Sequence, residues 1–294
     1  MLILNSHVLA HLAILAPGLL GASVAKAARA RNAARSITIW ARRPETRDAL
    51  RAQPFADTIA DTPADAVRDA DLVVLAAPVE KIIELAVQIA PALKPGAIVT
   101  DVGSVKARIC RECAAAMPPH ALFIGSHPMA GSAKSGWENA DASLFENCTT
   151  FVMQPENELQ VSAFAFALKV ASVCDFWDSL GATPVIVTPS QHDEIVAHIS
   201  HLPQALATTL AALLAKKNPE WRDYAGNGLR DTTRIAASDA TMWVDIFQQN
   251  RDDILRALDA CQAELAAFRD ALEKNDLPQL RARLETGKQF RDAL

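Results

Sequence analysis

Several features that would indicate a nucleic-acid-binding or membrane protein are missing from this sequence of 294 residues. The net charge is −5, no run of basic residues occurs, and only 5% of the residues are aromatic. A nucleic-acid-binding surface needs clustered Lys and Arg, so no nucleic-acid partner is expected. No apolar run approaches the roughly 18 residues that a membrane-spanning helix requires, so no membrane partner is expected either.

Cysteine is also scarce, and its pattern is not that of a disulfide framework or a metal site. The five cysteines are an odd number, which favours reduced thiols and a cytoplasmic location. Cys110 and Cys113 are spaced like half of a zinc site, but no second pair follows at zinc spacing. We therefore interpret them as incidental cysteines in a helix, and no metal is expected.

Apolar residues, in contrast, make up half of the chain, which is enough for one large or two ordinary domains. Residues 1–16 are apolar but have no basic region at their start. They are therefore expected to be a leading segment and a first strand rather than a signal peptide.

Apolar strands alternate with helical patterns over the first two thirds of the chain. The strands are continuously apolar, which is typical of a parallel sheet covered by helices on both faces. Predicted strands cover residues 12–16, 36–40, 71–76, 97–101, 121–124, 149–153 and 183–187; predicted helices cover 22–31, 44–52, 79–90, 105–117 and 159–180. The pattern predicts an α/β domain over residues 1–188.

The remaining residues show only helical patterns, at 191–217, 240–272 and 277–290. They predict an all-helical domain over residues 189–294. Because these helices are apolar on more than one face, they need a partner, and we expect a homodimer formed through this domain.

A glycine turn joins the first predicted strand to the first predicted helix, with the spacing Ala16-x-Gly18-x-x-Gly21. This is a dinucleotide-binding fingerprint, in which one glycine lets the backbone approach the pyrophosphate and another allows close helix–strand packing. Ala16 departs from the usual first glycine and tolerates a positive φ less well. The α/β domain is therefore predicted to be a Rossmann-type, dinucleotide-binding domain.

The second predicted strand ends in Arg42-Arg43, with no carboxylate where one would accept a hydrogen bond from the ribose 2′-hydroxyl of NAD. Guanidinium groups suit a 2′-phosphate, so NADP is favoured and NAD stays possible. The alternative is that both arginines are solvated surface residues. The expected cofactor-binding residues are Gly18, Leu19, Leu20, Gly21, Arg42, Arg43, Ala77 and Pro78.

The chemistry is expected in residues 125–137, a Gly-, Ser- and Pro-rich segment that contains His127 and reads as a loop after a buried strand. Ligands of open α/β sheets bind at the carboxyl ends of the strands. Ser104 follows another strand and should face the same crevice, although it could also cap the next helix.

The helical half contains further polar groups. His192-Asp193 and the segment Ser200–Gln204 interrupt an apolar helix, and a single helical His is more often structural than functional. A glycine-containing segment carries Arg230 and Arg234. These arginines could bind an anionic substrate or could be surface charges.

Taken together, these motifs resemble the prephenate/arogenate dehydrogenase family, the cyclohexadienyl dehydrogenases of tyrosine biosynthesis. Four blocks carry the resemblance in the family's order, at Asp101–Lys106, Gly125–Gly136, Ser200–Pro203 and Asp231–Trp243. The resemblance implies a Rossmann domain followed by a helical dimerisation domain. It also implies oxidative decarboxylation of prephenate or arogenate to 4-hydroxyphenylpyruvate or tyrosine, with hydride transfer to NAD(P).

The resemblance also implies roles for individual residues. His127 would accept the substrate's hydroxyl proton, with Ser104 hydrogen-bonding at the same place, and Arg234 would bind a substrate carboxylate. The other expected substrate-binding residues are His201, Gln204, Ser126 and Trp243.

Two positions depart from common family choices. Ala133 stands where many members carry a glutamate, and Gln204 stands where many prephenate-specific members carry a histidine. A neutral Gln204 could hydrogen-bond an amino-acid arm, which leans towards arogenate or tolerance of both substrates. The residues after the helical pattern are too few for a regulatory domain or a fused chorismate mutase, so any inhibition by tyrosine is expected to be competitive.

Two other functions fit parts of the sequence. One is an NADP-dependent dehydrogenase of the β-hydroxyacid or imine-reductase type, but residues 190–205 offer no persuasive catalytic Lys or Asp for it. The other is a non-catalytic NADP-sensing protein, which fold alone does not exclude. The sensing protein would bind cofactor without a change in absorbance at 340 nm when either cyclohexadienyl substrate is added.

Overall fold

The computed structural model describes residues 8–131, 134–155 and 162–294. They form two compact units, one within Met1–Asp193 together with Ser238–Gln249, and the other made of Glu194–Ala237 and Asn250–Leu294. Unit 1 is the α/β unit and unit 2 is helical, as the sequence predicts for the fold class. Unit 1 also includes one helix from the later part of the chain.

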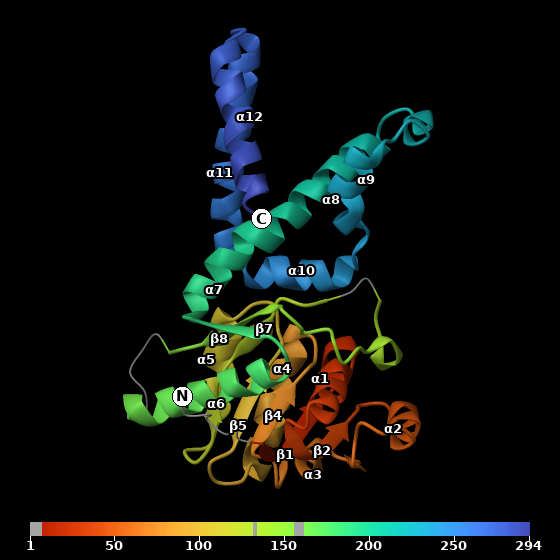
Figure 1. Cartoon of the computed structure of the whole chain (residues 1–294), viewed down its shortest axis with the longest axis vertical. Helices are drawn as coiled ribbons and strands as arrows, with labels where there is room; N and C mark the ends of the chain where they lie inside the picture. The colour runs from red at the N-terminus through yellow and green to blue at the C-terminus, as the bar shows by residue number, and fades with distance from the viewer. Residues whose placement is uncertain (1–7, 132–133, 156–161) are drawn as a thin grey trace. The chain divides into compact units, whose positions relative to one another are not determined.

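The main sheet of unit 1 has six parallel strands in the order β3-β2-β1-β4-β5-β6 (Figure 1). They are β1 (Leu9–Leu15), β2 (Ala34–Trp40), β3 (Thr58–Ile59), β4 (Leu72–Leu75), β5 (Ile98–Asp101) and β6 (Leu122–Phe123). Leu15 is in register with both Trp40 and Leu75, and Leu75 is in register with Asp101. Four strands therefore end at the same level, which gathers the loops that follow them at one edge.

Helices cover both faces of this sheet. The helices α1 (Leu19–Ala30), α2 (Pro44–Arg51) and α6 (Ala163–Ser179) contribute to one apolar core, and α3 (Pro63–Val67), α4 (Val79–Ile89) and α5 (Ala107–Ala116) contribute to the other. The continuously apolar strands β1 and β4 supply side chains to both cores, as expected for a sheet buried on both faces. The short elements β3 and α3 were not predicted.

A second sheet has three strands, β7 (Ser126–Pro128), β8 (Thr149–Met153) and β9 (Thr183–Val187). β8 and β9 are parallel, as in the main sheet, but β7 runs antiparallel to β8 and aligns His127 with Phe151. The prediction of a loop for His127 was therefore wrong, because pairing with a strand distant in sequence outweighs the Gly- and Pro-rich local composition.

The helices after residue 188 are α7 (Pro189–Val196), α8 (Leu202–Ala215), α9 (Asn227–Thr233), α10 (Ala240–Gln249), α11 (Arg251–Glu273) and α12 (Leu277–Asp292). A π-helical segment, Ala197–His201, precedes α8, and Pro203 lies in the first turn of α8. Proline has no N–H, so it cannot make the regular bond to the preceding turn. The single helix predicted over residues 240–272 is two helices, divided at Asn250 (φ −107°, ψ 30°). Of these two, α10 belongs to unit 1.

Within the part of the chain that the structure describes, no helix is both long enough and apolar enough to cross a membrane.

Candidate active site

The glycine turn lies at the carboxyl end of β1, between the ends of β2 and β4. The N–H of Ala16 donates to the carbonyl of Trp40 (2.9 Å), and the N–H of Gly18 donates to the carbonyl of Ala16 (2.8 Å). Ala16 adopts φ +62°, so it occupies the left-handed conformation that a glycine would adopt without strain. The turn has thus kept its shape despite the departure at its first position.

The two glycines of this turn have opposite surroundings. A Cβ added to Gly18 would meet no atom within 4 Å, whereas one added to Gly21 would lie 2.7 Å from the Cβ of Ala76. Gly21 therefore permits close packing of α1 on the sheet, and Gly18 begins α1 beside open space. These are the surroundings that the fingerprint requires, because a pyrophosphate would approach the backbone at Gly18 and the N-terminus of α1. The residues present fit a dinucleotide.

The ribose end of this site is marked by Arg42 and Arg43, which follow β2. Both side chains are exposed, and neither forms an ion pair with another residue that the structure describes. Arg47 differs, because it donates to the carbonyl of Ala41 and lies 3.5 Å from a carboxylate oxygen of Asp61. Two positive charges are thus available beside the turn.

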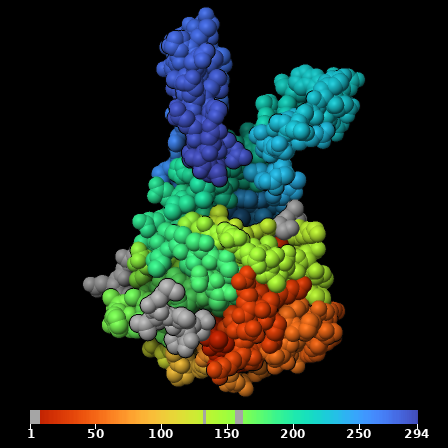
Figure 2. All heavy atoms as spheres, in the orientation of Figure 1, coloured from red at the N-terminus to blue at the C-terminus, as the bar shows by residue number. Residues whose placement is uncertain are grey.

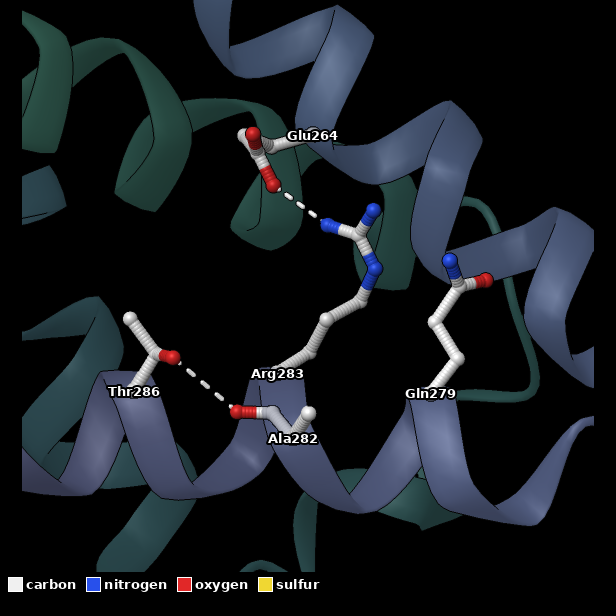
Figure 3. A pocket seen from close by; sticks show the side chains of 5 residues that line it. All are labelled: Glu264, Gln279, Ala282, Arg283 and Thr286. Carbon is white, nitrogen blue, oxygen red and sulfur yellow. Dashed lines mark hydrogen bonds and ion pairs between the residues drawn. The ribbon is translucent and has the colours of Figure 1, made fainter.

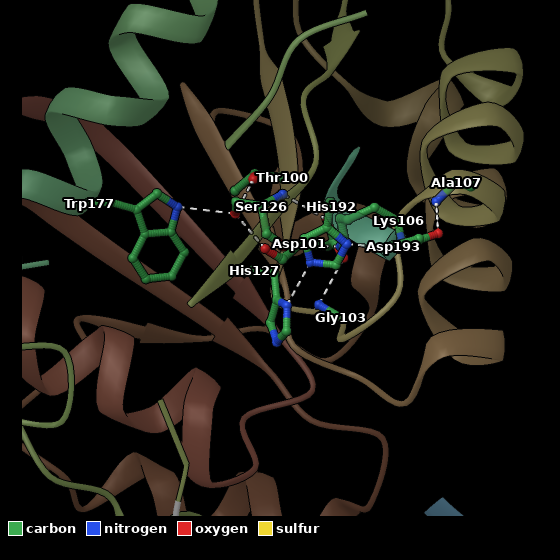
Figure 4. Close-up of polar contacts among 10 residues, drawn as sticks. All are labelled: Thr100, Asp101, Gly103, Lys106, Ala107, Ser126, His127, Trp177, His192 and Asp193. Atoms are coloured by element: carbon green, nitrogen blue, oxygen red, sulfur yellow. Dashed lines mark hydrogen bonds and ion pairs between the residues drawn. The ribbon is translucent and has the colours of Figure 1, made fainter. Parts of the chain in front are cut away.

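His127 makes a series of hydrogen bonds with two residues of α7, His192 and Asp193 (Figure 4). Its Nδ1 lies 2.8 Å from Nε2 of His192, and Nδ1 of His192 lies 2.7 Å from Oδ1 of Asp193. His127 is half-buried, while His192 is fully buried and Asp193 is 3% exposed. The half-buried imidazole is therefore backed by a buried imidazole and a buried carboxylate.

A buried ion pair is hydrogen-bonded to Ser126, the residue before His127. The Lys106 ammonium donates to Asp101 Oδ2 and to the carbonyl of Ser126 (3.0 Å), and both charged side chains are fully buried. Asp101 also accepts from the N–H groups of Gly103 (2.8 Å) and Ser126 (3.1 Å). Burial raises the pKa of the Asp101 carboxyl above its ordinary value, against the opposing effect of Lys106. The pair connects the end of β5 to β7 and so fixes the strand that carries His127.

Ser126 was expected to bind substrate, but its hydroxyl points into the interior. It donates to the carbonyl of Asp101 (2.6 Å), accepts from the Trp177 indole N–H (3.0 Å) and lies 2.8 Å from the Thr100 hydroxyl. One donated and two accepted bonds satisfy a hydroxyl completely. Ser126 therefore anchors β7, and we do not retain it among the substrate-binding residues.

Ser104 follows β5 and is half-buried. Its hydroxyl makes no hydrogen bond with any other residue that the structure describes. It does not cap the next helix, because α5 begins at Ala107 and its first N–H groups donate to Asp193 instead. The alternative of a helix cap is thus excluded for Ser104, and its hydroxyl can serve a ligand.

Of the residues expected to bind substrate from the later part of the chain, Trp243 lies in unit 1, where it packs against the core on one face of the sheet. Arg234, His201 and Gln204 lie in unit 2. Arg234 is exposed and forms no ion pair in the part of the chain that the structure describes. The departure at Ala133 lies outside the described residues.

His201 and Gln204 are both buried. The Asn250 side-chain amide lies 3.1 Å from Nδ1 of His201. The Gln204 amide nitrogen donates to Thr208 (3.3 Å), but its amide oxygen has no donor among the residues that the structure describes. A buried acceptor without a donor is costly in a folded protein, unless a ligand or water supplies one.

A hollow of about 280 Å³ lies between α11 and α12 in unit 2, and none of the candidate site residues lines it (Figure 3). Its lining includes an ion pair between Arg283 and Glu264 (2.5 Å). It contains no histidine, serine or cysteine and carries no candidate chemistry. Its lining residues are Glu264, Gln279, Ala282, Arg283 and Thr286.

His192 and Asp193 were not expected to have a functional role, and Asn250 was not among the expected site residues. The adjacent His-Asp pair was the available signal for the first two. No local pattern places His192 beside His127, because 65 residues separate them.

Comparisons with known proteins agree over most of the chain. The family model described as prephenate dehydrogenase, nucleotide-binding domain, matches residues 24–185, and the model described as prephenate dehydrogenase, dimerization domain, matches residues 188–286. Cyclohexadienyl dehydrogenase of Zymomonas mobilis is 32% identical over 289 residues, which cover 97% of this chain and 96% of that protein.

Solved structures of prephenate and arogenate dehydrogenases are also similar to this chain. Prephenate dehydrogenase of A. aeolicus, in complex with hydroxyphenyl propionate and NAD⁺, superposes with a TM-score of 0.86 at 27% identity, covering 97% of this chain and 98% of that chain. Synechocystis arogenate dehydrogenase superposes with a TM-score of 0.82 at 25% identity, covering 96% and 99%.

Proposed function

Because this chain belongs to the prephenate dehydrogenase family, we propose that it oxidatively decarboxylates prephenate, arogenate or both, in tyrosine biosynthesis. The observation that carries the proposal is His127, a half-buried imidazole on β7. The neighbouring Ser126 is hydrogen-bonded to Asp101 at the carboxyl end of β5, the edge of the main sheet where the glycine turn and Ser104 also lie. Neither a β-hydroxyacid dehydrogenase nor a sensing protein accounts for these residues as well.

The reaction needs a proton acceptor and a means of holding a carboxylate. The substrate is a cyclohexadienol with a ring carboxylate, and loss of carbon dioxide makes the ring aromatic. A bound nicotinamide cofactor would accept the hydride from the carbinol carbon. His127 accepts the hydroxyl proton as general base, the Ser104 hydroxyl hydrogen-bonds the same oxygen, and Arg234 binds a substrate carboxylate.

His127→Asn tests this proposal directly. The amide cannot accept the proton, so we expect kcat to fall about 10²–10⁴-fold while the substrate still binds. Absorbance at 340 nm with prephenate and with arogenate, each with NAD⁺ and NADP⁺, measures turnover. In the wild type, kcat/KM should rise with pH as the base loses its proton. Near-normal turnover of His127→Asn would refute the assignment.

Arg234→Ala tests the carboxylate-binding role. Loss of a charge-assisted, bidentate contact should mainly raise KM for the substrate, about 10-fold or more. Arg222→Ala is a matched control, because Arg222 is an exposed arginine of the same unit with no proposed role. An unchanged KM in Arg234→Ala would count against this role.

We propose that the cofactor is NADP. The support is the pair of exposed guanidinium groups at Arg42 and Arg43 and the lack of an acidic residue directly after β2. Replacing both arginines by alanine should lower kcat/KM for NADP⁺ more than for NAD⁺. A wild-type preference for NAD⁺ would overturn the proposal.

We propose that arogenate is accepted at least as well as prephenate. The buried amide oxygen of Gln204 has no donor among the described residues, and the ammonium of an amino-acid arm would supply one, whereas a pyruvyl arm would not. Gln204→His should shift the ratio of kcat/KM towards prephenate. If the ratio is unchanged, Gln204 does not select the arm.

We propose a homodimer formed through unit 2. Figure 2 shows that the arm made of α11 and α12 and the arm made of α8 and α9 diverge and leave open space between them. Large apolar side chains on these helices are exposed in the single chain, including Leu206, Leu213, Leu265, Leu272 and Leu284. Light scattering after size-exclusion chromatography should give twice the mass of one chain. The cytoplasmic location expected from the cysteines stays a prediction.

A further inference from the structure

We propose that His192 and Asp193 are positioning residues for the reaction, acting through His127. They would fix the tautomer that makes Nε2 of His127 the basic nitrogen, and they would share the positive charge when His127 is protonated. This inference rests on the proposed function in one respect, namely that His127 is the base. The arrangement itself is carried by two hydrogen bonds of 2.8 and 2.7 Å among half-buried and buried groups.

The tautomer follows from the donor and acceptor inventory of the three side chains. An ionised carboxylate only accepts, so Asp193 requires the proton on Nδ1 of His192. Neutral His192 then has an acceptor at Nε2, which requires the proton on Nδ1 of His127. Neutral His127 consequently has its lone pair on Nε2. Without these hydrogen bonds, both tautomers of His127 would be populated, and only one has its lone pair on that nitrogen.

Asp193 is held as a carboxylate by the start of helix α5. Its Oδ1 accepts from the N–H of Lys106 (2.7 Å) and its Oδ2 accepts from the N–H of Ala107 (2.8 Å). Backbone donors at a helix N-terminus favour the charged form of a carboxyl group. The ring of His192 is fixed as well, because it packs edge-on against Phe151 with centroids 5.3 Å apart.

The hydrogen bonds from His127 through His192 to Asp193 also stabilise the positive charge that proton transfer creates on His127. When Nε2 of His127 takes the substrate's proton, the ring becomes an imidazolium. The Nδ1 proton of His127 can then move along the 2.8 Å hydrogen bond to Nε2 of His192, which places the positive charge beside Asp193. Of the residues that the structure describes, Lys106 and Asp101 are the charged groups hydrogen-bonded to β7, and they form their own ion pair.

The tautomer can be measured without any turnover. Long-range proton–nitrogen NMR spectra of the imidazole rings in the full-length wild type should show His127 protonated on Nδ1 at a pH where it is neutral. In Asp193→Asn, a neutral amide that can either accept or donate replaces the carboxylate that requires the proton on Nδ1 of His192. We therefore expect part of the His127 population to carry its proton on Nε2. His127 protonated on Nε2 in the wild type would overturn the proposal.

Kinetics then test whether the tautomer matters. In Asp193→Asn, kcat should fall about 10²-fold or more, with KM little changed. In His192→Gln, the amide oxygen can still accept from Nδ1 of His127 but cannot take up charge, so we expect a fall of about 10-fold. In His192→Phe no acceptor remains, and the loss should exceed that of His192→Gln.

The pH profile separates this role from a purely structural one. A neighbouring carboxylate and a hydrogen-bond acceptor on Nδ1 both favour protonated imidazole. Asp193→Asn removes the carboxylate and His192→Phe removes the acceptor, so the acid limb of kcat/KM should move to lower pH in both variants. His120→Gln is the matched control, because His120 is an exposed histidine whose Nε2 lies 2.9 Å from the carbonyl of Leu93. It should leave kcat and the pH profile unchanged.

Two kinetic results would overturn the proposal. The first is wild-type kcat and pH profile in all three variants, and the second is a fall in kcat with an unchanged pH profile in each of them. If the wild type turns over neither prephenate nor arogenate, the proposed function fails instead, and the NMR measurement still decides the tautomer.

Discussion

Two glycines of the same turn should respond in opposite ways to the same substitution. In Gly21→Ala the new Cβ would lie 2.7 Å from Ala76 Cβ, 3.3 Å from Ile14 Cγ2 and 3.4 Å from the carbonyl of Ala16. Carbon atoms attract each other best at about 3.5–4.0 Å. The Cβ of Ala76 is attached directly to the backbone and cannot rotate away, so helix α1 must shift from the sheet.

The magnitude follows from two opposing effects. Overpacking in a tight core costs about 1–3 kcal/mol, and the better helix propensity of alanine returns up to about 1 kcal/mol. We therefore expect Gly21→Ala to lower the free energy of unfolding by about 1–2 kcal/mol. For a domain of this size, that lowers Tm by about 2–8 °C.

Gly18→Ala is the matched variant, because its Cβ would meet no atom within 4 Å and its φ is −73°. Its stability should change by only a few tenths of a kcal/mol. Because the new methyl group would occupy the space where the pyrophosphate approaches, the Kd for the cofactor should rise.

Thermal unfolding measures the stability of both variants. A fluorescence titration with NADP⁺ measures the Kd of each variant for the cofactor. The reasoning would be refuted if Gly21→Ala were as stable as the wild type. It would also be refuted if Gly18→Ala bound the cofactor with unchanged affinity.

Three further predictions concern the unit that carries the turn. Lys106→Met should lower the free energy of unfolding, measured in urea, by about 3–5 kcal/mol, because it leaves the Asp101 carboxyl buried without its partner. Adding Asp101→Asn should recover part of this loss. A double variant that is no more stable than Lys106→Met would contradict the prediction. Ala16→Gly should raise the free energy of unfolding by about 1 kcal/mol, because φ +62° is strained for alanine; a lower Tm would count against it. Burial raises the pKa of the Cys113 thiol to about 12 and also raises the pKa of the Cys110 thiol, so both should resist iodoacetamide at pH 8 until the protein is unfolded. Mass spectrometry checks this, and rapid labelling of either thiol in the native protein would show that it is accessible.

Much of the α/β unit follows from the sequence because its signals are local. Continuous apolar runs predict strands buried on both faces, and the strands β1, β2, β4 and β5 lie where these runs occur. The turn at Gly18 and Gly21 could be predicted because the spacing of its glycines is a short local pattern. The close contact that Gly21 permits is with Ala76, which follows β4 and is distant in sequence. The prediction for the His127 segment failed because β7 owes its conformation to β8, which lies more than 20 residues further along the chain.

The sequence by itself determined the family, the class of fold, and the residues His127 and Ser104 as candidates, because these depend on residue types at short spacings. Only the tertiary structure decided what surrounds them. It turned the Ser126 hydroxyl inwards, buried Lys106 against Asp101, and placed His192 and Asp193 behind His127. The physical reason is that hydrogen bonds between residues distant in the chain depend on how strands and helices pack, which no local pattern records.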